Sequence, residues 1–267
     1  MNDDAPVGVF DSGLGGLTVL RALIDLLPGE ALVYFGDTGR FPYGPKPRDE
    51  VRHHAHQIAD LLVERGVKAL VVACNSAAAA ALDELGDRLD VPVVGVIEPG
   101  LRAGMSVTRT GRVGVIGTVG TIASGAYQQL AVRIDPSVEL TCAACPGFVE
   151  FVEAGDVDSD QVHVLAERLL APVRAADVDT LVLGCTHYPL LARTIGDAMG
   201  RDVVLVSSAD ETAFAVRNLL ADKKMLRSTR NGADHTFLTS GSVETFRRLG
   251  GRFLGPEVTA VEGWRWS

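Results

Sequence analysis

VKALVVACNS at residues 67–76 and VDTLVLGCTH at residues 178–187 are two similar stretches that decide the fold. Each is a short apolar run that ends in a cysteine and continues into polar residues. Such a run, followed by a helical pattern, is typical of a buried parallel strand in a βα unit. The likeness between the two stretches indicates that the chain contains two related halves.

Two further pairs of stretches support an internal duplication. VGVFDS at residues 7–12 resembles VGVIGT at residues 113–118, and DVPVV at residues 90–94 resembles DVVLV at residues 202–206. The three pairs follow one order at a nearly constant offset, which chance matches among valine-rich strands would not favour. We therefore predict an α/β fold of two pseudo-symmetric domains, each a mostly parallel sheet flanked by helices, with the active site in the cleft between them.

The expected elements alternate along the chain. Strands are expected at residues 6–10, 31–35, 69–73, 91–96, 112–116, 139–142, 180–183 and 203–206. Helices are expected at residues 17–27, 48–65, 77–89, 124–134, 161–175 and 211–220. We expect residues 1–97 and 209–267 to form the domain that carries Cys74, and residues 98–208 to form the domain that carries Cys185.

Composition narrows the class of protein. The 267 residues include 25 Lys and Arg against 34 Asp and Glu, a net charge of −9, which disfavours a nucleic acid as substrate. The longest uncharged stretch, residues 113–132, is too rich in Gly, Ser, Thr and Gln to favour a membrane span. Four cysteines are too few for a disulfide framework, and the start, MNDDAPVGVF, lacks the positive charge of an export signal. We expect a cytoplasmic protein with no membrane partner.

Cys74 and Cys185 indicate the chemistry. Each follows a predicted strand and so lies at the sheet edge where ligands of open α/β sheets bind. Two thiols that approach one cleft from opposite sides could remove a proton from one face of a carbon and return one to the other. Asp11 and His187 are candidate neighbours that could activate them. The alternative is a pair of buried structural cysteines.

Four motifs carry a family resemblance: GVFDSGLGGLTV (8–19), YFGDTGRFPYG (34–44), VVACNSA (71–77) and LVLGCTHYPLL (181–191). In this order and spacing they resemble the glutamate racemases of the aspartate/glutamate racemase superfamily. The resemblance implies cofactor-independent interconversion of L- and D-glutamate, with supply of D-glutamate for peptidoglycan, no metal, and an enzyme that we expect to be a homodimer.

The resemblance also implies roles for particular residues. Cys74 would act on D-glutamate and Cys185 on L-glutamate, with Asp11, His187, Asp37 and Glu153 as further ionisable groups, although Glu150 lies one turn from Glu153. The residues that would hold the substrate are Asp11, Ser12, Pro42, Tyr43, Gly44, Asn75, Ser76, Thr118, Thr186 and His187. The chain departs from the family pattern at Ser76, where Thr is usual, and at Gly39, where Ala is usual. We expect Gly39 to add freedom to the loop before Tyr43.

Other motifs favour other functions less strongly. SGLGG at residues 12–16 lacks the lysine of a phosphate-binding loop, and the Cys142–Cys145 pair has no second pair to complete a zinc site. His53, His54 and His56 lack an acid that would complete a ligand set. The four lysines (46, 68, 223 and 224) lie in no motif for a Schiff base, which disfavours pyridoxal chemistry. The Trp264–Trp266 stretch is either an interface or a docked tail.

Two alternatives to glutamate racemisation stay open at this point. One is another substrate of the superfamily: aspartate, a hydantoin, or maleate. The other is a catalytically silent binding protein on the same fold, although such a protein would not need both cysteines.

Overall fold

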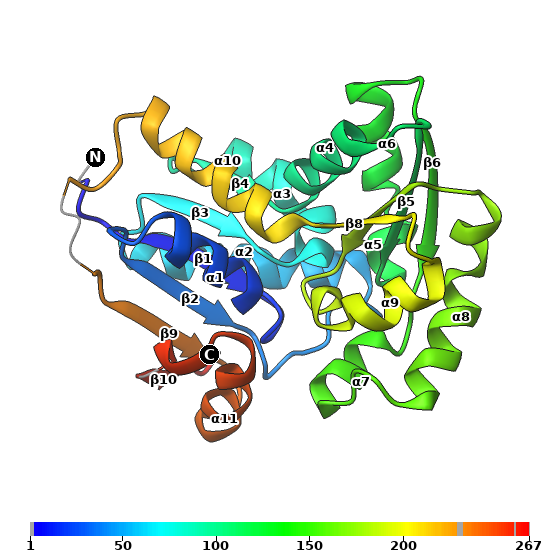
Figure 1. Ribbon diagram of the computed structural model, residues 1–267. Coiled ribbons are helices and arrows are strands. Elements are labelled where there is room, and N and C mark those ends of the chain that lie inside the picture. The colour runs from blue at the N-terminus through cyan, green and yellow to red at the C-terminus, as the bar shows by residue number, and fades with distance from the viewer. Residues whose placement is uncertain (1–2, 229–231, 259, 267) are drawn as a thin grey trace.

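The computed structural model describes residues 3–228, 232–258 and 260–266, and their strands form two parallel sheets (Figure 1). The first sheet has the order β10-β9-β2-β1-β3-β4, and every neighbouring pair is parallel. Its strands are β1 (Val7–Asp11), β2 (Leu32–Gly36), β3 (Ala69–Val72), β4 (Val93–Gly95), β9 (His235–Thr239) and β10 (Val261–Gly263).

The second sheet repeats the inner order of the first. It runs β6-β5-β7-β8, again with parallel pairs, which matches β2-β1-β3-β4 strand for strand. Its strands are β5 (Arg112–Gly117), β6 (Glu139–Ala144), β7 (Thr180–Gly184) and β8 (Val204–Ser207). The predicted α/β fold with two pseudo-symmetric sheets is confirmed.

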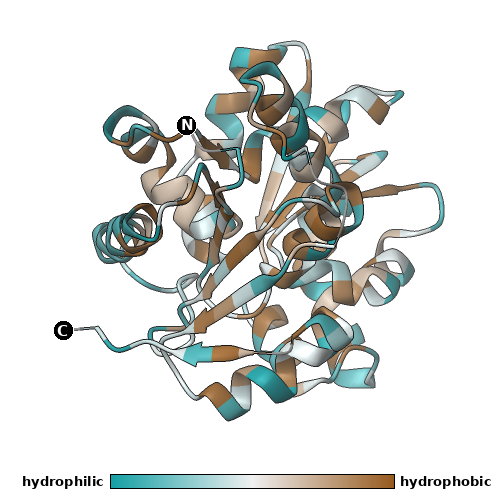
Figure 2. Cartoon of the chain, turned by 90° about the vertical axis from the view of Figure 1, so that its left-hand side faces the viewer, coloured by the Kyte–Doolittle hydropathy of each residue, from teal (hydrophilic) through white to brown (hydrophobic). Residues whose placement is uncertain are grey.

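Helices cover both sheets, and their apolar faces turn toward the strands. Figure 2 shows the hydrophobic residues along the strands and the polar ones concentrated on the helices. The helices are α1 (Leu17–Leu26), α2 (Arg48–Glu64), α3 (Asn75–Arg88), α4 (Ile97–Val107), α5 (Val119–Ala123), α6 (Ala126–Ile134), α7 (Phe148–Ala154), α8 (Asp160–Ala175), α9 (Ala192–Met199), α10 (Ser208–Asp222) and α11 (Val243–Phe253). Two 3₁₀ turns, η1 (Tyr188–Leu191) and η2 (Gly255–Glu257), complete the described elements.

The structure adds α4, α7, α9 and α11 to the expected helices, and it differs from the expectation in two further places. The helix expected at residues 124–134 begins only at Ala126, because the chain turns at Gly125, whose φ is +72°, after the separate helix α5. Strands β9 and β10 were not expected. They extend the first sheet beyond β2, where β9 pairs with β2 along its whole length.

The last part of the chain returns to the first sheet. Helix α10 follows β8 and packs against both α1 and α4, across the top of Figure 1. Strands β9 and β10 then lie at the outer edge of the first sheet, and α11 lies below them (Figure 1). Trp264 and Trp266 are partly buried against the core, so this end of the chain is a docked tail.

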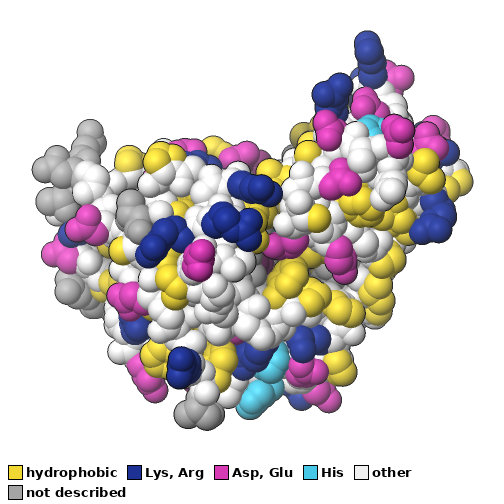
Figure 3. Space-filling model, turned by 90° about the horizontal axis from the view of Figure 1, so that it is seen from below, with side chains coloured by type: hydrophobic (Ala, Val, Ile, Leu, Met, Phe, Trp, Pro, Cys, Tyr) yellow, Lys and Arg dark blue, Asp and Glu magenta, His cyan; other side chains and the backbone are white. Residues whose placement is uncertain are grey.

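The described surface has mixed charge. Seen from below, acidic and basic side chains are interspersed over the face in Figure 3. None of the helices in the described residues is both long enough and apolar enough to cross a membrane.

Candidate active site

One cavity collects residues from the carboxyl ends of strands in both sheets. Asp11 ends β1, Cys74 follows β3, and Cys185 follows β7. Twelve of the residues expected at the site line this cavity: Asp11, Ser12, Pro42, Tyr43, Gly44, Cys74, Asn75, Ser76, Thr118, Cys185, Thr186 and His187. Parallel strands with the same internal order in two facing sheets thus bring the two repeated cysteines to one place.

Several lining residues were not expected. They are Phe41, Pro45, Val119, Cys145, Pro146, Gly147, Val149 and Glu150. Most of them follow β6, in the turn at Cys145 and Pro146 and in the first residues of α7. The Cys145–Pro146 pair after a predicted strand was the available signal. Cys142 lies within β6 and does not line the cavity.

The Cys74 thiol lies beside an acid and a hydroxyl. Cys74 is 5% exposed and precedes α3, and its Sγ donates a long hydrogen bond to Ser12 Oγ (3.7 Å). Burial and the neighbouring Asp11 carboxylate raise the pKa of this thiol to about 12. Hydrogen bonds from the Ala77 backbone and from Ser12 offset only part of that rise. Cys74 is therefore a protonated thiol at neutral pH.

The Cys185 thiol lies beside an imidazole instead. Its Sγ is 3.9 Å from His187 Nδ1, and His187 Nε2 is 2.8 Å from Glu153 Oε1. Burial lowers the pKa of His187, but hydrogen bonds with Cys185 and Glu153 outweigh that effect and raise its pKa to about 10. The His187 ring contacts the rings of Phe41 (6.0 Å between centroids) and Phe253 (5.9 Å). A buried imidazolium can thus stabilise a thiolate on this side.

Two buried acceptors of the cavity have no donor among the described residues. Asp11 Oδ2 accepts from the Gly13 N–H (2.9 Å), but its Oδ1 has no partner there. Asn75 Nδ2 donates to the Tyr127 hydroxyl (2.9 Å), and its Oδ1 likewise has no partner. A buried oxygen without a donor is costly, so the pair suits a ligand that brings N–H groups.

The two halves meet through hydroxyl groups at the cavity. Ser76 Oγ lies 2.9 Å from Thr118 Oγ1 and 3.2 Å from Thr121 Oγ1. The Ser76 hydroxyl therefore joins α3 to α5. Ser76 stands where threonine is usual in the family motif. Gly15 lies at the other contact, because a Cβ there would come within 2.3 Å of Thr186 Oγ1. That glycine in SGLGG lets the second half approach closely.

Asp37 and Glu153 do not line the cavity. Glu153 contacts the cavity residue His187, and Glu153 itself lines a separate hollow beside α11. Asp37 is fully buried behind Tyr43 and forms an ion pair with Arg40 (2.7 Å). Both acids contact residues that line the cavity, Asp37 through Tyr43 and Glu153 through His187.

The cluster of His53, His54 and His56 does not line the cavity. His54 contacts Arg40 and Glu50, and His56 contacts Glu84. In the described part of the chain, no group of three or more His, Cys, Asp or Glu side chains could hold a metal ion.

Comparisons with known proteins agree with this geometry. The model of the Asp/Glu/hydantoin racemase family matches residues 8–216. A glutamate racemase from Parafrankia sp. is 55% identical over 96% of this chain and 93% of its own length. The crystal structure of a glutamate racemase from Bacillus anthracis superposes with a TM-score of 0.95 at 42% identity, covering 98% of each chain. A glutamate racemase from Francisella tularensis, solved in complex with D-glutamate, gives 0.92 at 35% identity and 98% of each chain.

Proposed function

The chain belongs to the Asp/Glu/hydantoin racemase family, and we propose that it interconverts L- and D-glutamate with Cys74 and Cys185 as its two bases. One observation carries the proposal: the two cysteines of the internal repeat line one cavity from different sheets. Full-length likeness to glutamate racemases supports glutamate over aspartate, a hydantoin or maleate. The presence of both thiols supports an enzyme over a silent binding protein.

The proposed step moves one proton off the α-carbon and another on. A thiolate at Cys185 takes the α-proton of L-glutamate and becomes a thiol. The Cys74 thiol donates its proton to the opposite face and becomes a thiolate. The carbon inverts, and no net charge is gained or lost by protein and substrate together. The reverse reaction starts from the Cys74 thiolate and D-glutamate.

The charges around the thiols suit this step. His187, held by Glu153, is charged at neutral pH and stabilises negative charge on Cys185. On the other side, burial and then the Asp11 carboxylate raise the pKa of Cys74 and keep this thiol protonated. A substrate ammonium against the free Asp11 Oδ1 would offset the Asp11 charge, and so would make the Cys74 thiolate easier to form on turnover.

The polar cavity residues suit the rest of the substrate. The Asn75 Oδ1 that lacks a donor can accept from the same ammonium. Hydroxyls of Ser76, Thr118 and Thr186 can donate to its carboxylates without a fixed positive charge next to the thiols. Ser12, Pro42 and Gly44 complete this proposed binding set.

Purified protein in D₂O tests the proposal directly. Without added pyridoxal phosphate, we expect each glutamate enantiomer to reach an equal mixture, with deuterium at the α-carbon of the product. Aspartate, a hydantoin and maleate serve as competing substrates in the same assay. Turnover of one of them in preference to glutamate, or racemisation that keeps the original α-hydrogen, would contradict the proposal.

We also propose the wider setting of the enzyme. Residues 1–97 with 209–267 form one domain and residues 98–208 the other, and the enzyme works as a cytoplasmic homodimer that supplies D-glutamate for peptidoglycan. Gel filtration with light scattering tests the dimer. Depletion of the enzyme tests the supply, because growth should then depend on added D-glutamate.

A further inference from the structure

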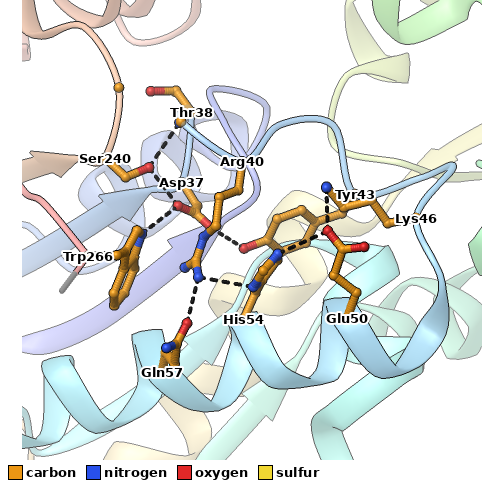
Figure 4. Close-up of polar contacts among 12 residues, drawn as sticks. Asp37, Thr38, Arg40, Tyr43, Lys46, Glu50, His54, Gln57, Ser240 and Trp266 are labelled. Carbon is orange, nitrogen blue, oxygen red and sulfur yellow. Dashed lines mark hydrogen bonds and ion pairs between the residues drawn. The ribbon is translucent and has the colours of Figure 1, made fainter.

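Asp37 is a buried carboxylate that gathers hydrogen bonds from distant parts of the chain (Figure 4). Its side chain is fully buried and does not line the cavity. Oδ2 accepts from Arg40 Nε at 2.7 Å and from the Tyr43 hydroxyl, both in the loop that follows β2. Oδ1 accepts from Ser240 Oγ at 2.6 Å and from Trp266 Nε1 at 3.2 Å, both near the end of the chain.

The end of the chain is fitted against this loop. The Trp266 ring packs against Phe35 (5.4 Å between centroids), and the Arg40 guanidinium stacks over it at 4.1 Å. Arg40 also donates to Gln57 of α2 at 2.6 Å. Trp266 therefore contacts both the Asp37 carboxylate and the Arg40 guanidinium, the two groups that hold the loop after β2 in place.

Gly39 shows how closely the two segments approach. A Cβ at this position would lie 2.7 Å from the Ser240 carbonyl oxygen, and the Gly39 N–H donates to Ser240 Oγ at 2.9 Å. The expectation that Gly39 adds freedom to the loop is wrong. The β9–α11 turn occupies the space that a methyl group at this position would need.

The loop transmits this arrangement to the cavity through Tyr43. Its ring is 1% exposed, and it lines the cavity between Pro42 and Gly44. The Gly44 carbonyl accepts the Gly120 N–H of the second half at 2.9 Å. A shift of Asp37 would therefore move both a wall of the site and a contact between the halves.

We propose that Asp37 is a positioning residue, through which Ser240 and Trp266 hold the substrate loop at residues 37–44 in its binding geometry. The expected change in KM rests on the proposed function, whereas the expected change in the loop itself does not. Both enantiomers occupy the cavity that Tyr43 lines, so loss of the tether weakens the binding of both alike and leaves proton transfer at the cysteines intact.

Two tryptophans of the same tail make a matched test. Trp266→Phe removes the N–H that Asp37 accepts and keeps an aromatic ring on Phe35 and Arg40. Trp264→Phe removes an indole N–H that has no hydrogen-bond partner among the described residues. We expect W266F to raise the KM of both enantiomers by about threefold to tenfold, with kcat within about twofold, because a hydrogen bond to a charged group is lost. W264F should leave both constants within about twofold.

A second measurement needs no substrate. Hydrogen exchange followed by mass spectrometry should show faster exchange at residues 37–44 in W266F than in W264F or the wild type. If W266F does not fold, Ser240→Ala replaces it, since this variant removes the other distant donor. Equal KM values in W266F and W264F, together with unchanged exchange of the loop, would overturn the inference. A wild type that leaves glutamate unchanged would instead overturn the proposed function, and the exchange measurement would still decide the role of the tether.

Discussion

The Cys74 and Cys185 sites are built from the same repeat, yet their neighbours carry opposite charges. Each cysteine follows a central parallel strand, β3 or β7, beside the strand that begins its half. At the end of that neighbouring strand the first half has Asp11, where the second half has Gly117. Two residues after each cysteine the first half has Ser76, where the second half has His187.

These two differences between the halves give each thiol a different charged neighbour. Burial, together with Asp11, raises the pKa of Cys74 to about 12, whereas His187, with its own pKa raised to about 10, offers Cys185 a positive charge. The duplicated backbone places the two thiols at equivalent strand ends, and the unduplicated side chains place a carboxylate beside the proposed acid and an imidazole beside the proposed base. A two-base racemisation needs that difference at the start of each turnover.

The largest expected effect comes from removing either thiol. Cys74→Ala and Cys185→Ala should each lower racemisation by at least about 10³-fold, because an essential proton donor or acceptor is lost. The remaining cysteine should still exchange the α-proton of one enantiomer in D₂O without inversion: D-glutamate in C185A and L-glutamate in C74A. Proton NMR of each enantiomer measures this.

Cys142→Ala is the control for both variants, because Cys142 does not line the cavity. Its rate should stay within about twofold of the wild type. Wild-type racemisation by either single-cysteine variant, or exchange of the same enantiomer by both, would break the comparison between the two sides.

Smaller effects follow from exchanging the neighbours. His187→Gln should lower kcat by about tenfold to a hundredfold, since Cys185 loses its stabilising charge.

Asp11→Asn should lower the pKa of Cys74, so the rise of kcat with pH for D-glutamate should move to lower pH. The profile for L-glutamate should move less in D11N, because Asp11 raises the pKa of His187 by less than Cys185 and Glu153 do. These profiles come from initial rates in both directions.

Thermodynamics supplies an internal check on these rates. Enantiomers have equal free energies in water, so kcat/KM must be the same in both directions for every variant. A variant that changes kcat in one direction only must therefore change KM in that direction by the same factor. If D11N and H187Q shift the same limb of the same pH profile, the opposite roles assigned to Asp11 and His187 are wrong.

The sequence could predict the elements that position the thiols. The valine-rich runs indicated eight of the ten described strands, and the repeat placed Cys74 and Cys185 at equivalent strand ends. Twelve of the fourteen expected site residues line the cavity, because residues next to a strand end lie at a sheet edge whatever the details of packing.

The rest depended on contacts between distant residues. β9 and β10 are short edge strands, and no local pattern shows that HTFLT pairs with β2. Asp37 lies in a motif that resembles a site, but its partners Ser240 and Trp266 are about 200 residues away in sequence. The same distance hid the reason for Gly39, since the carbonyl that excludes a methyl group belongs to Ser240.

The smallest expected effect is a dependence of stability on pH that belongs to the Cys185 side alone. The pKa of His187 is about 10 in the folded protein, above its ordinary value of 6.5. Its contribution to folding is thus complete below about pH 6.5 and is lost as the pH rises through about 10. Cys74, whose pKa rises from 9.0 to about 12, contributes such a loss only above about pH 9. Between about pH 7 and 9 the wild type should therefore lose up to about 2 kcal/mol, or a few degrees in Tm, because of His187, and less to the extent that Cys185 has given up its own proton in the folded protein. Thermal unfolding at both pH values should show a smaller drop in H187Q, whereas an equal drop in both proteins would mean that folding brings no net proton to the His187–Cys185 pair.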